Sequence, residues 1–105
     1  MRTLTLDSYV IETLLPDLVG HDRRPSAFLV YLALAARSSA RTDAARLSLR
    51  DLAGLTGLSK RTIQGALRVL VRRRLVAVSR DGATEVAAYE VKRPWRRRTV
   101  APASG

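Results

Sequence analysis

Residues 47–78 read LSLRDLAGLTGLSKRTIQGALRVLVRRRLVAV, and this stretch decides the fold of the chain. Apolar residues recur every three or four positions on both sides of residues 56–59, a pattern typical of two amphipathic helices joined by a tight turn. Ser48 is suited to begin the first helix, and Asp51 three positions later completes a short capping box. Gly57 lies where that helix ends and where a residue with positive φ is preferred. The stretch therefore predicts a helix, a turn and a second helix.

The second helix has one apolar side and one cationic side. Ser59 is its expected N-cap. The residues that we expect to face the core are Ile63, Ala66, Leu67, Leu70 and Val71. The opposite side has no acidic residue and consists of Lys60, Arg61, Gln64, Gly65, Arg68 and Arg72. Such a face is suited to contact with a polyanion.

The hydrophobic period changes from helical to alternating after Arg74. Residues 75–78 and 84–91 are each typical of a strand, and Asp81-Gly82 between them is a strong hairpin-turn signal. The return strand has Ala87, Tyr89 and Val91 on one side and Val86, Ala88 and Glu90 on the other. A very short strand is also expected at residues 46–48, before the helical pair.

The sequence before this stretch predicts two further helices. Tyr9–Leu15 has apolar residues at helical spacing, and Pro16 ends or kinks this helix, so that residues 16–22 are expected to form a connector. A longer helix has Pro25 in its first turn and ends near Arg37. It is apolar on most sides and is expected to lie centrally in the core. The expected divisions are an N-terminal extension with a short helix (1–21), a main domain (22–91) and a basic flexible tail (92–105).

The positive charge of the chain is concentrated in its second part. Residues 1–45 carry five Arg and five acidic residues, whereas residues 46–105 carry fourteen Lys and Arg and four acidic residues. The formal net charge of +10 therefore arises entirely from residues 46–105. A balanced part joined to a strongly basic part favours a nucleic acid as the partner.

Taken together, these signals resemble the winged helix-turn-helix domain of small bacterial and phage regulators, such as the MarR and GntR groups. The resemblance covers about residues 25–91 and rests on Leu52-Ala53, the turn Thr56-Gly57-Leu58-Ser59, and then Thr62-Ile63, Ala66-Leu67 and Leu70. It implies a mainly α fold with a small β-hairpin. It also implies a sequence-specific transcription regulator that binds double-stranded DNA, with helix 60–73 in the major groove and hairpin 75–91 as a wing on the DNA backbone.

Two residues near the start of helix 60–73 are suited to contact base edges. Arg61 can donate two hydrogen bonds to guanine, and Gln64 can bind adenine through two hydrogen bonds, each pair worth ~1–3 kcal/mol of discrimination. Gly65 departs from the related domains, which often have a long polar residue there, and glycine in a helix interior costs ~1 kcal/mol relative to alanine. Either DNA or another helix approaches the backbone at Gly65, or the position is lightly constrained.

Other residues are suited to contact the DNA backbone, which fixes register without reading sequence. Ser59 and Thr62 are small and can let backbone N–H groups approach a phosphate at the helix N-terminus. Lys60 and Arg68 are suited to bind phosphates directly. The remaining basic residues that we expect at the DNA are Arg80 at the hairpin tip and Arg93 and Arg96 in the tail. Each of these three has a simpler role as a solvated cation, and Trp95 either meets a base or packs back on the domain.

Two other functions are open. Winged helices also serve as adaptors for protein–protein contacts in replication or partition complexes, and there Arg61 and Gln64 would contact an acidic protein. The basic segment Lys92–Arg98 can bind RNA, whose narrow major groove excludes a recognition helix. A homodimer is expected if the apolar residues of the N-terminal extension pack across a two-fold axis; these are Leu4, Leu6, Val10, Leu14 and Leu18.

Signals of catalysis and of membrane insertion are missing from the sequence. There is no cysteine, no glycine-rich phosphate loop and no metal-ligand cluster, and the single histidine, His21, is expected in a loop. The apolar run 27–36 is half as long as a membrane-spanning helix, and no signal-peptide pattern begins the chain. We therefore expect a soluble, cytoplasmic protein that is not an enzyme, needs no metal or cofactor and makes no membrane contact.

Overall fold

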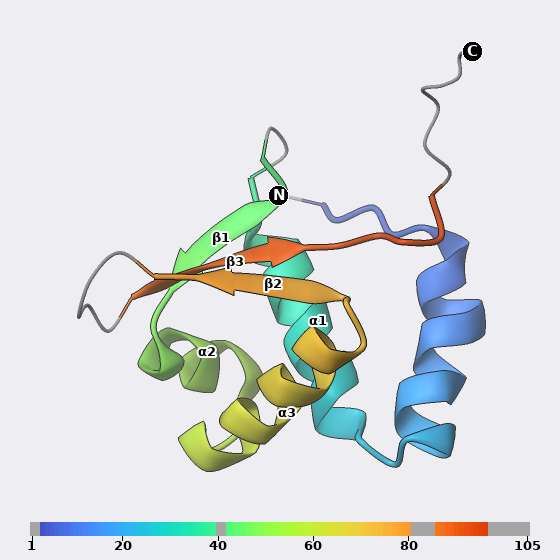
Figure 1. Ribbon diagram of the computed structural model, residues 1–105, viewed down its shortest axis with the longest axis horizontal. Coiled ribbons are helices and arrows are strands. Elements are labelled where there is room, and N and C mark those ends of the chain that lie inside the picture. The colour runs from blue at the N-terminus through green and yellow to red at the C-terminus, as the bar shows by residue number, and fades with distance from the viewer. Residues whose placement is uncertain (1–2, 40–41, 81–85, 97–105) are drawn as a thin grey trace.

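The predicted helical pair is present and packs against a longer helix and a small sheet (Figure 1). The structure is a computed structural model that describes residues 3–39, 42–80 and 86–96. In chain order the elements are η1 (Val10–Leu14), η2 (Pro16–His21), α1 (Pro25–Arg37), β1 (Ala44–Leu47), α2 (Leu49–Thr56), α3 (Lys60–Arg72), β2 (Val76–Ser79) and β3 (Ala87–Val91). This mainly helical architecture with a small antiparallel sheet confirms the predicted winged helix-turn-helix. Within the described residues, no helix has the length and apolar character needed to cross a membrane.

Helix α2 begins and ends where its local sequence predicts. The Ser48 hydroxyl accepts a hydrogen bond from the Asp51 N–H at 3.1 Å, and the Asp51 carboxylate accepts one from the Ser48 N–H at 2.9 Å. The Ser48 N–H is the main reason that the pKa of Asp51 lies below its ordinary value. At the other end Gly57 has φ +78°, a left-handed conformation that glycine adopts without strain. Both the capping box and the glycine C-cap are confirmed.

Helix α1 is the central element, packed against α2, α3, η2, β1 and β3. The buried side of α3 consists of Ile63, Ala66, Leu67, Val69 and Leu70. This differs from the prediction at two positions, because Val71 is 44% exposed whereas Val69 is only 5% exposed. Val69 is on the side of α3 that faces Asp22 and Arg24, the residues that precede α1. Val71 is on the other side and lines two grooves between α3 and the sheet.

The sheet has the order β1-β3-β2, with both pairs antiparallel. Tyr89 of the central strand pairs with Ala45 on one side and with Val78 on the other. Ala87, Tyr89 and Val91 are buried, which confirms the predicted alternation in β3. β1 begins at Ala44, two residues earlier than predicted. Its start depends on pairing with β3, a distant strand, and the local sequence does not show that pairing. The predicted Asp81-Gly82 turn lies outside the described residues.

The expected connector at residues 16–22 is wrong, because this segment is helical. η1 and η2 are π-helical segments whose hydrogen bonds join residues five apart, for example from the Asp22 N–H to the Asp17 carbonyl at 2.8 Å. Pro16 is the first residue of η2, but Leu15 before it also has helical φ and ψ, and its N–H donates to the Val10 carbonyl. The predicted end of the helix at Pro16 is therefore wrong, because the helical segment continues through the proline.

The apolar side of the N-terminal segment packs inside its own chain. Val10, Leu14 and Leu18 belong to the buried core, and Leu6 is partly buried against it. Of the five apolar residues expected at a two-fold axis, only Leu4 is largely exposed, at 49%. These residues therefore do not form the free apolar face on which the expected homodimer depended, and the homodimer stays a prediction without that basis.

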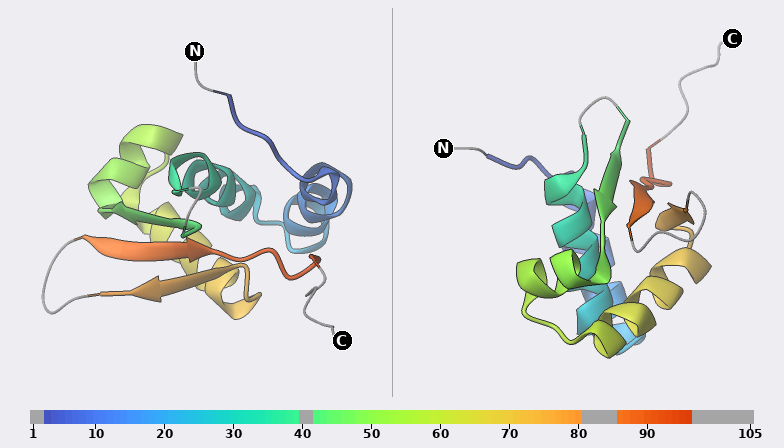
Figure 2. Two further views of the ribbon diagram at one scale, coloured as in Figure 1. Left: turned by 90° about the horizontal axis from the view of Figure 1, so that it is seen from above. Right: turned by 90° about the vertical axis from the view of Figure 1, so that its left-hand side faces the viewer.

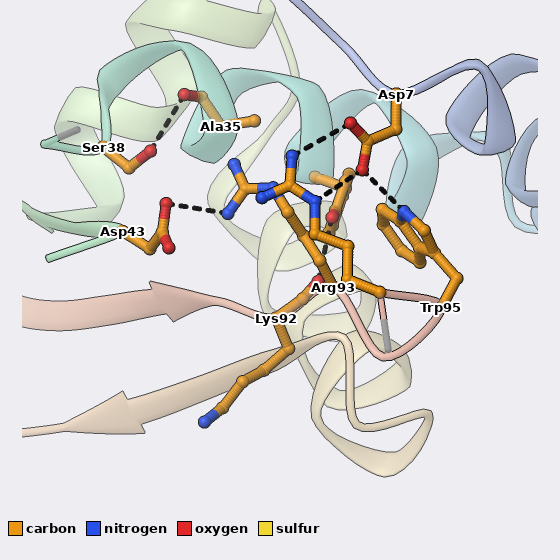
Figure 3. Close-up of polar contacts among 9 residues, drawn as sticks. Asp7, Ala35, Ser38, Asp43, Lys92, Arg93 and Trp95 are labelled. Atoms are coloured by element: carbon orange, nitrogen blue, oxygen red, sulfur yellow. Dashed lines mark hydrogen bonds and ion pairs between the residues drawn. The ribbon is translucent and has the colours of Figure 1, made fainter. Parts of the chain in front are cut away.

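The expectation of a flexible tail from Lys92 onward is wrong for residues 92–96, which pack on the N-terminal segment (Figure 3). The Trp95 ring stacks on Tyr9 with centroids 4.7 Å apart, and its indole N–H donates to Asp7 at 2.7 Å. Arg96 donates to both oxygens of Asp7 at 2.7 and 2.9 Å. We call these four residues the terminal clasp. Figures 1 and 2 show the segment that follows β3 running to the N-terminal helical segment.

Two further contacts extend the packing of this segment. The Arg93 guanidinium lies 2.8 Å from the Asp43 carboxylate, and the Tyr31 hydroxyl donates to the Lys92 carbonyl at 2.9 Å. Burial raises the pKa of Tyr31 to about 12, so this hydroxyl remains a donor across the ordinary pH range. The open alternative for Trp95 is thereby decided, since its ring packs on the domain.

Acid is expected to open the terminal clasp. Hydrogen bonds from Arg96 and Trp95 lower the pKa of Asp7 from 3.8 to about 2. A depressed pKa means that the carboxylate stabilises the clasp fully above pH 3.8 and that this contribution is lost as the pH falls through about 2. Trp95 is the only tryptophan, so its emission should shift to the red in this window.

The variant Asp7→Asn provides the control for the acid prediction. It lacks the carboxylate at every pH, so acrylamide should quench Trp95 more strongly than in the wild-type protein already at neutral pH. The Trp95 emission of this variant should also show no further shift caused by the clasp between pH 3.8 and about 2. Equal quenching of the two proteins at neutral pH would show that Asp7 does not hold Trp95.

Candidate nucleic-acid interface

The turn between α2 and α3 is fixed by hydrogen bonds from one side chain. The Thr56 hydroxyl donates to the Leu52 carbonyl at 2.7 Å and accepts from the Leu58 N–H at 3.1 Å. The Gly57 N–H donates to the Ala53 carbonyl at 2.8 Å. Thr56 is the first residue of the predicted turn, and a threonine at such a position commonly bonds to nearby backbone. These bonds set the direction in which α3 leaves the turn.

The first turn of α3 is held by its N-cap. The Ser59 hydroxyl accepts from the Thr62 N–H at 3.1 Å and donates to the Thr62 hydroxyl at 2.9 Å. The Ile63 N–H donates to the Ser59 carbonyl at 3.0 Å. The Ile63 N–H thus makes the first regular bond of the helix. Among the N–H groups before it, that of Thr62 is capped by Ser59, and those of Lys60 and Arg61 remain for an outside acceptor. Ser59 and Thr62 are both exposed, as a phosphate contact there would require.

The outward face of α3 consists of exposed residues of the kind predicted. Lys60, Arg61, Gln64, Arg68 and Arg72 are all exposed. No carboxylate in the described part of the chain forms an ion pair with any of these four cations. The prediction that this side is cationic and turned to solvent is therefore confirmed. An uncompensated group of cations is expected to attract a polyanion.

A groove of about 600 Å³ runs between α3 and the hairpin of β2 and β3. Its α3 wall includes Gln64, Arg68 and Arg72, and its hairpin wall includes Val78, Arg80 and Tyr89. The described residues that line this groove include no acid. The fold thus brings Arg80 to the same surface as three residues of α3. Sequence spacing alone could not show this convergence.

The structure places Arg93 and Arg96 away from this surface. They line a second groove, of about 1140 Å³, together with Arg74 and Trp95, and both are paired with carboxylates. The guanidinium of Arg73, the C-cap residue of α3, lies against Asp17 and Asp22 of the N-terminal segment. Apart from Arg80, the described basic residues after Arg72 therefore make packing contacts or line this second groove.

Gly65 lies in the middle of the outward face without a close neighbour of another helix. A Cβ placed on Gly65 would lie 3.6 Å from the Arg24 Nη1 atom and 3.8 Å from the Arg68 Nη2 atom. These are ordinary van der Waals distances, and no backbone of another element comes within 4 Å of that point. Close approach of another helix is therefore not the reason for the glycine.

Replacement of Gly65 by alanine is expected to stabilise the fold. The methyl group has room, and alanine is favoured over glycine in a helix interior by up to ~1 kcal/mol. Urea denaturation should show a higher midpoint for Gly65→Ala with an unchanged slope. Gly57→Ala is the contrasting variant, because its φ of +78° makes alanine strained there and should lower stability. A fall in stability for Gly65→Ala would mean that the methyl group has less room beside α3 than these distances indicate.

Metal ligation finds no support in the part of the chain that is described. No three His, Cys, Asp or Glu side chains come together there in the way that a metal ion requires. The expectations that the protein has no metal, no cofactor and no catalytic residue stay predictions.

Comparison with known families agrees with this geometry. A family model described as a helix-turn-helix domain matches residues 24–76, from the residue before α1 to the first residue of β2. Comparisons with curated proteins and with solved structures find no match. The match includes α1 and both helices of the predicted pair, and it confirms the resemblance found in the sequence. The chain therefore belongs to a family of helix-turn-helix domains.

Proposed function

We propose that this protein is a transcription regulator that recognises a specific sequence of double-stranded DNA. Membership of a helix-turn-helix family suggests DNA binding. The observation that carries the proposal is the outward face of α3, where Arg61, Gln64 and Arg68 are exposed and no carboxylate of the described residues neutralises the cations. A face of this kind is suited to the major groove, which admits one α-helix.

Arg61 and Gln64 are the residues that we assign to base edges. They are three positions apart, so their side chains project from neighbouring points of one helix face. Three residues rise ~4.5 Å along a helix, which is close to the ~3.4 Å between successive base pairs. The two side chains can therefore read adjacent or nearly adjacent base pairs, a guanine by Arg61 and an adenine by Gln64.

Contacts to phosphates would fix the position of α3 in the groove. At the helix start, the Ser59 and Thr62 hydroxyls and the N–H groups of Lys60 and Arg61 lie where the helix dipole favours an anion. On the hairpin side, Arg80 lines the groove beside α3 and is suited to the DNA backbone next to the wing. Arg93 and Arg96, which are paired with Asp43 and Asp7, are not part of the proposed interface.

Fluorescence anisotropy on two duplexes tests the proposal. One duplex is selected from a random library for binding, and the other is a scrambled version of it. Two bidentate contacts of ~1–3 kcal/mol each predict that the selected duplex binds at least roughly 30-fold more tightly. Affinity should also fall steeply as salt rises from about 50 to about 200 mM. Equal, weak binding to both duplexes would contradict the proposal and favour an adaptor for proteins.

A further inference from the structure

We propose that Arg24 and Arg68 together bind one phosphate of the DNA backbone, above Gly65. This inference rests on the proposed function, since the phosphate belongs to the duplex that holds α3. Both guanidinium groups lie within 4 Å of the point where a Cβ of Gly65 would be. Arg24 precedes α1 and Arg68 is in α3, so two distant parts of the sequence supply the two cations.

The charges around Gly65 favour an anion at this point. Two guanidinium groups that share one small region repel each other unless an anion lies between them. No acidic side chain of the described residues forms an ion pair with either group, and the nearby carboxylate of Asp22 is already engaged by Arg73 at 3.3 Å and by His21 at 3.1 Å. Arginine is well suited to phosphate because its planar group donates paired hydrogen bonds.

The backbone of Arg24 is held in place although its side chain is exposed. Arg23 has φ +54°, a left-handed conformation that is uncommon for a residue other than glycine, and it turns the chain sharply from η2 into α1. The Arg24 N–H then donates to the Leu18 carbonyl at 2.7 Å. Arg24 is the N-cap of α1, but its side chain makes no capping hydrogen bond. The side chain is thus free to extend over α3.

This arrangement gives Gly65 a role. A long side chain at residue 65 would fill the space in which the two guanidinium groups meet, whereas glycine leaves it open. Arg24 then supplies, from another element, a cation close to the position where related domains have a long polar residue. The surface of α3 near Gly65 therefore carries a positive charge that can meet DNA, although Gly65 itself has no side chain.

The location of Arg24 also explains how α3 would be positioned between two backbones. Gln64 and Val71 line the groove toward the hairpin, whereas Arg24 lies with Val69 on the opposite flank of α3. Arg80 and Arg24 therefore lie on either side of the helix. In the major groove, they would contact the two phosphate backbones that border it, and this would fix the depth and register at which Arg61 meets a base.

The test compares Arg24→Gln with Arg37→Gln on the selected duplex over a series of salt concentrations. Both variants remove one charge from the ends of the same helix, and Arg37 is at the far end of α1 from Arg24. Loss of one phosphate contact lowers the slope of log affinity against log salt by about 0.9. We expect this change for Arg24→Gln and no change for Arg37→Gln, with the preference for the selected duplex retained in both. Equal slopes for the two variants would overturn the phosphate site.

A second measurement locates the phosphate. Single phosphates of the selected duplex are replaced one at a time by uncharged methylphosphonate. One replacement should weaken binding of the wild-type protein more than that of Arg24→Gln, which keeps only Arg68 at that phosphate. If every replacement weakens both proteins equally, Arg24 binds no phosphate. If the wild-type protein does not prefer the selected duplex at all, the proposed function fails and this inference fails with it. Thermal melting of both variants checks that each is folded.

Discussion

The double variant Arg61→Ala with Gln64→Ala is expected to bind the selected duplex at least roughly 30-fold more weakly than the wild-type protein, since each bidentate base contact is worth ~1–3 kcal/mol and ~1.4 kcal/mol is tenfold in affinity. Both side chains are exposed, so their removal leaves the core intact. Binding to the scrambled duplex should fall much less, because it depends on phosphate contacts. Anisotropy titrations on the two duplexes measure both effects.

The variant Arg61→Lys separates charge from hydrogen-bond geometry. Lysine keeps the positive charge but lacks the planar fork that binds guanine through two hydrogen bonds. The salt dependence of Arg61→Lys should therefore match that of the wild-type protein, whereas its preference for the selected duplex should decrease. If Arg61→Lys retains the full preference, Arg61 contacts a phosphate and reads no base. If the double variant retains it too, the bases are read elsewhere.

The variant Leu52→Ala is expected to lower the free energy of unfolding by about 2–5 kcal/mol, the usual loss for a buried leucine. Leu52 is 0% exposed and is the buried residue of α2, which packs on α1 and α3. Its removal leaves a cavity where the two helices of the pair meet. Since small domains are stable by only about 5–15 kcal/mol, this one change removes a large share of the total. Urea denaturation monitored by circular dichroism gives the value.

Leu55→Ala is the matched control, with the same chemical change one turn later in the same helix. Leu55 is 38% exposed, so less apolar surface is lost from the interior and no comparable cavity forms. We expect its effect to be well below that of Leu52→Ala. If both variants lost similar amounts of unfolding free energy, the substitutions would act only on the stability of α2 itself. Leu52 would then not hold α2 against α3.

The helical pair could be predicted from sequence because its determinants are local. Ser48 with Asp51 and the left-handed Gly57 act within a few residues of each other, and each is present in the structure. The cationic side of α3 is also a local property, since it follows from helical periodicity. The one error on α3, Val71 in place of Val69, arose because the neighbours that cover a helix come from distant parts of the chain.

The features that sequence could not predict depend on contacts between remote residues. Trp95 and Arg96 bind Asp7 across nearly the whole chain, so a basic, proline-containing segment that is typical of a flexible tail is packed through residue 96. In the same way, the proximity of Arg24 to Gly65 requires the folded arrangement of α1 and α3. Composition indicates that these residues are charged, but it does not indicate which charges are paired and which are left for a partner.

The most direct test of the account is to map the DNA contact by amide chemical shifts in NMR spectra of the protein titrated with the selected duplex. We expect the largest shifts in the first two turns of α3 and along the groove between α3 and the hairpin, with a further shift at Arg24. Amides near Trp95 should change little, because that surface is held by the terminal clasp. The largest shifts at residues 92–96, with α3 unchanged, would contradict the claim that the outward face of α3 binds DNA.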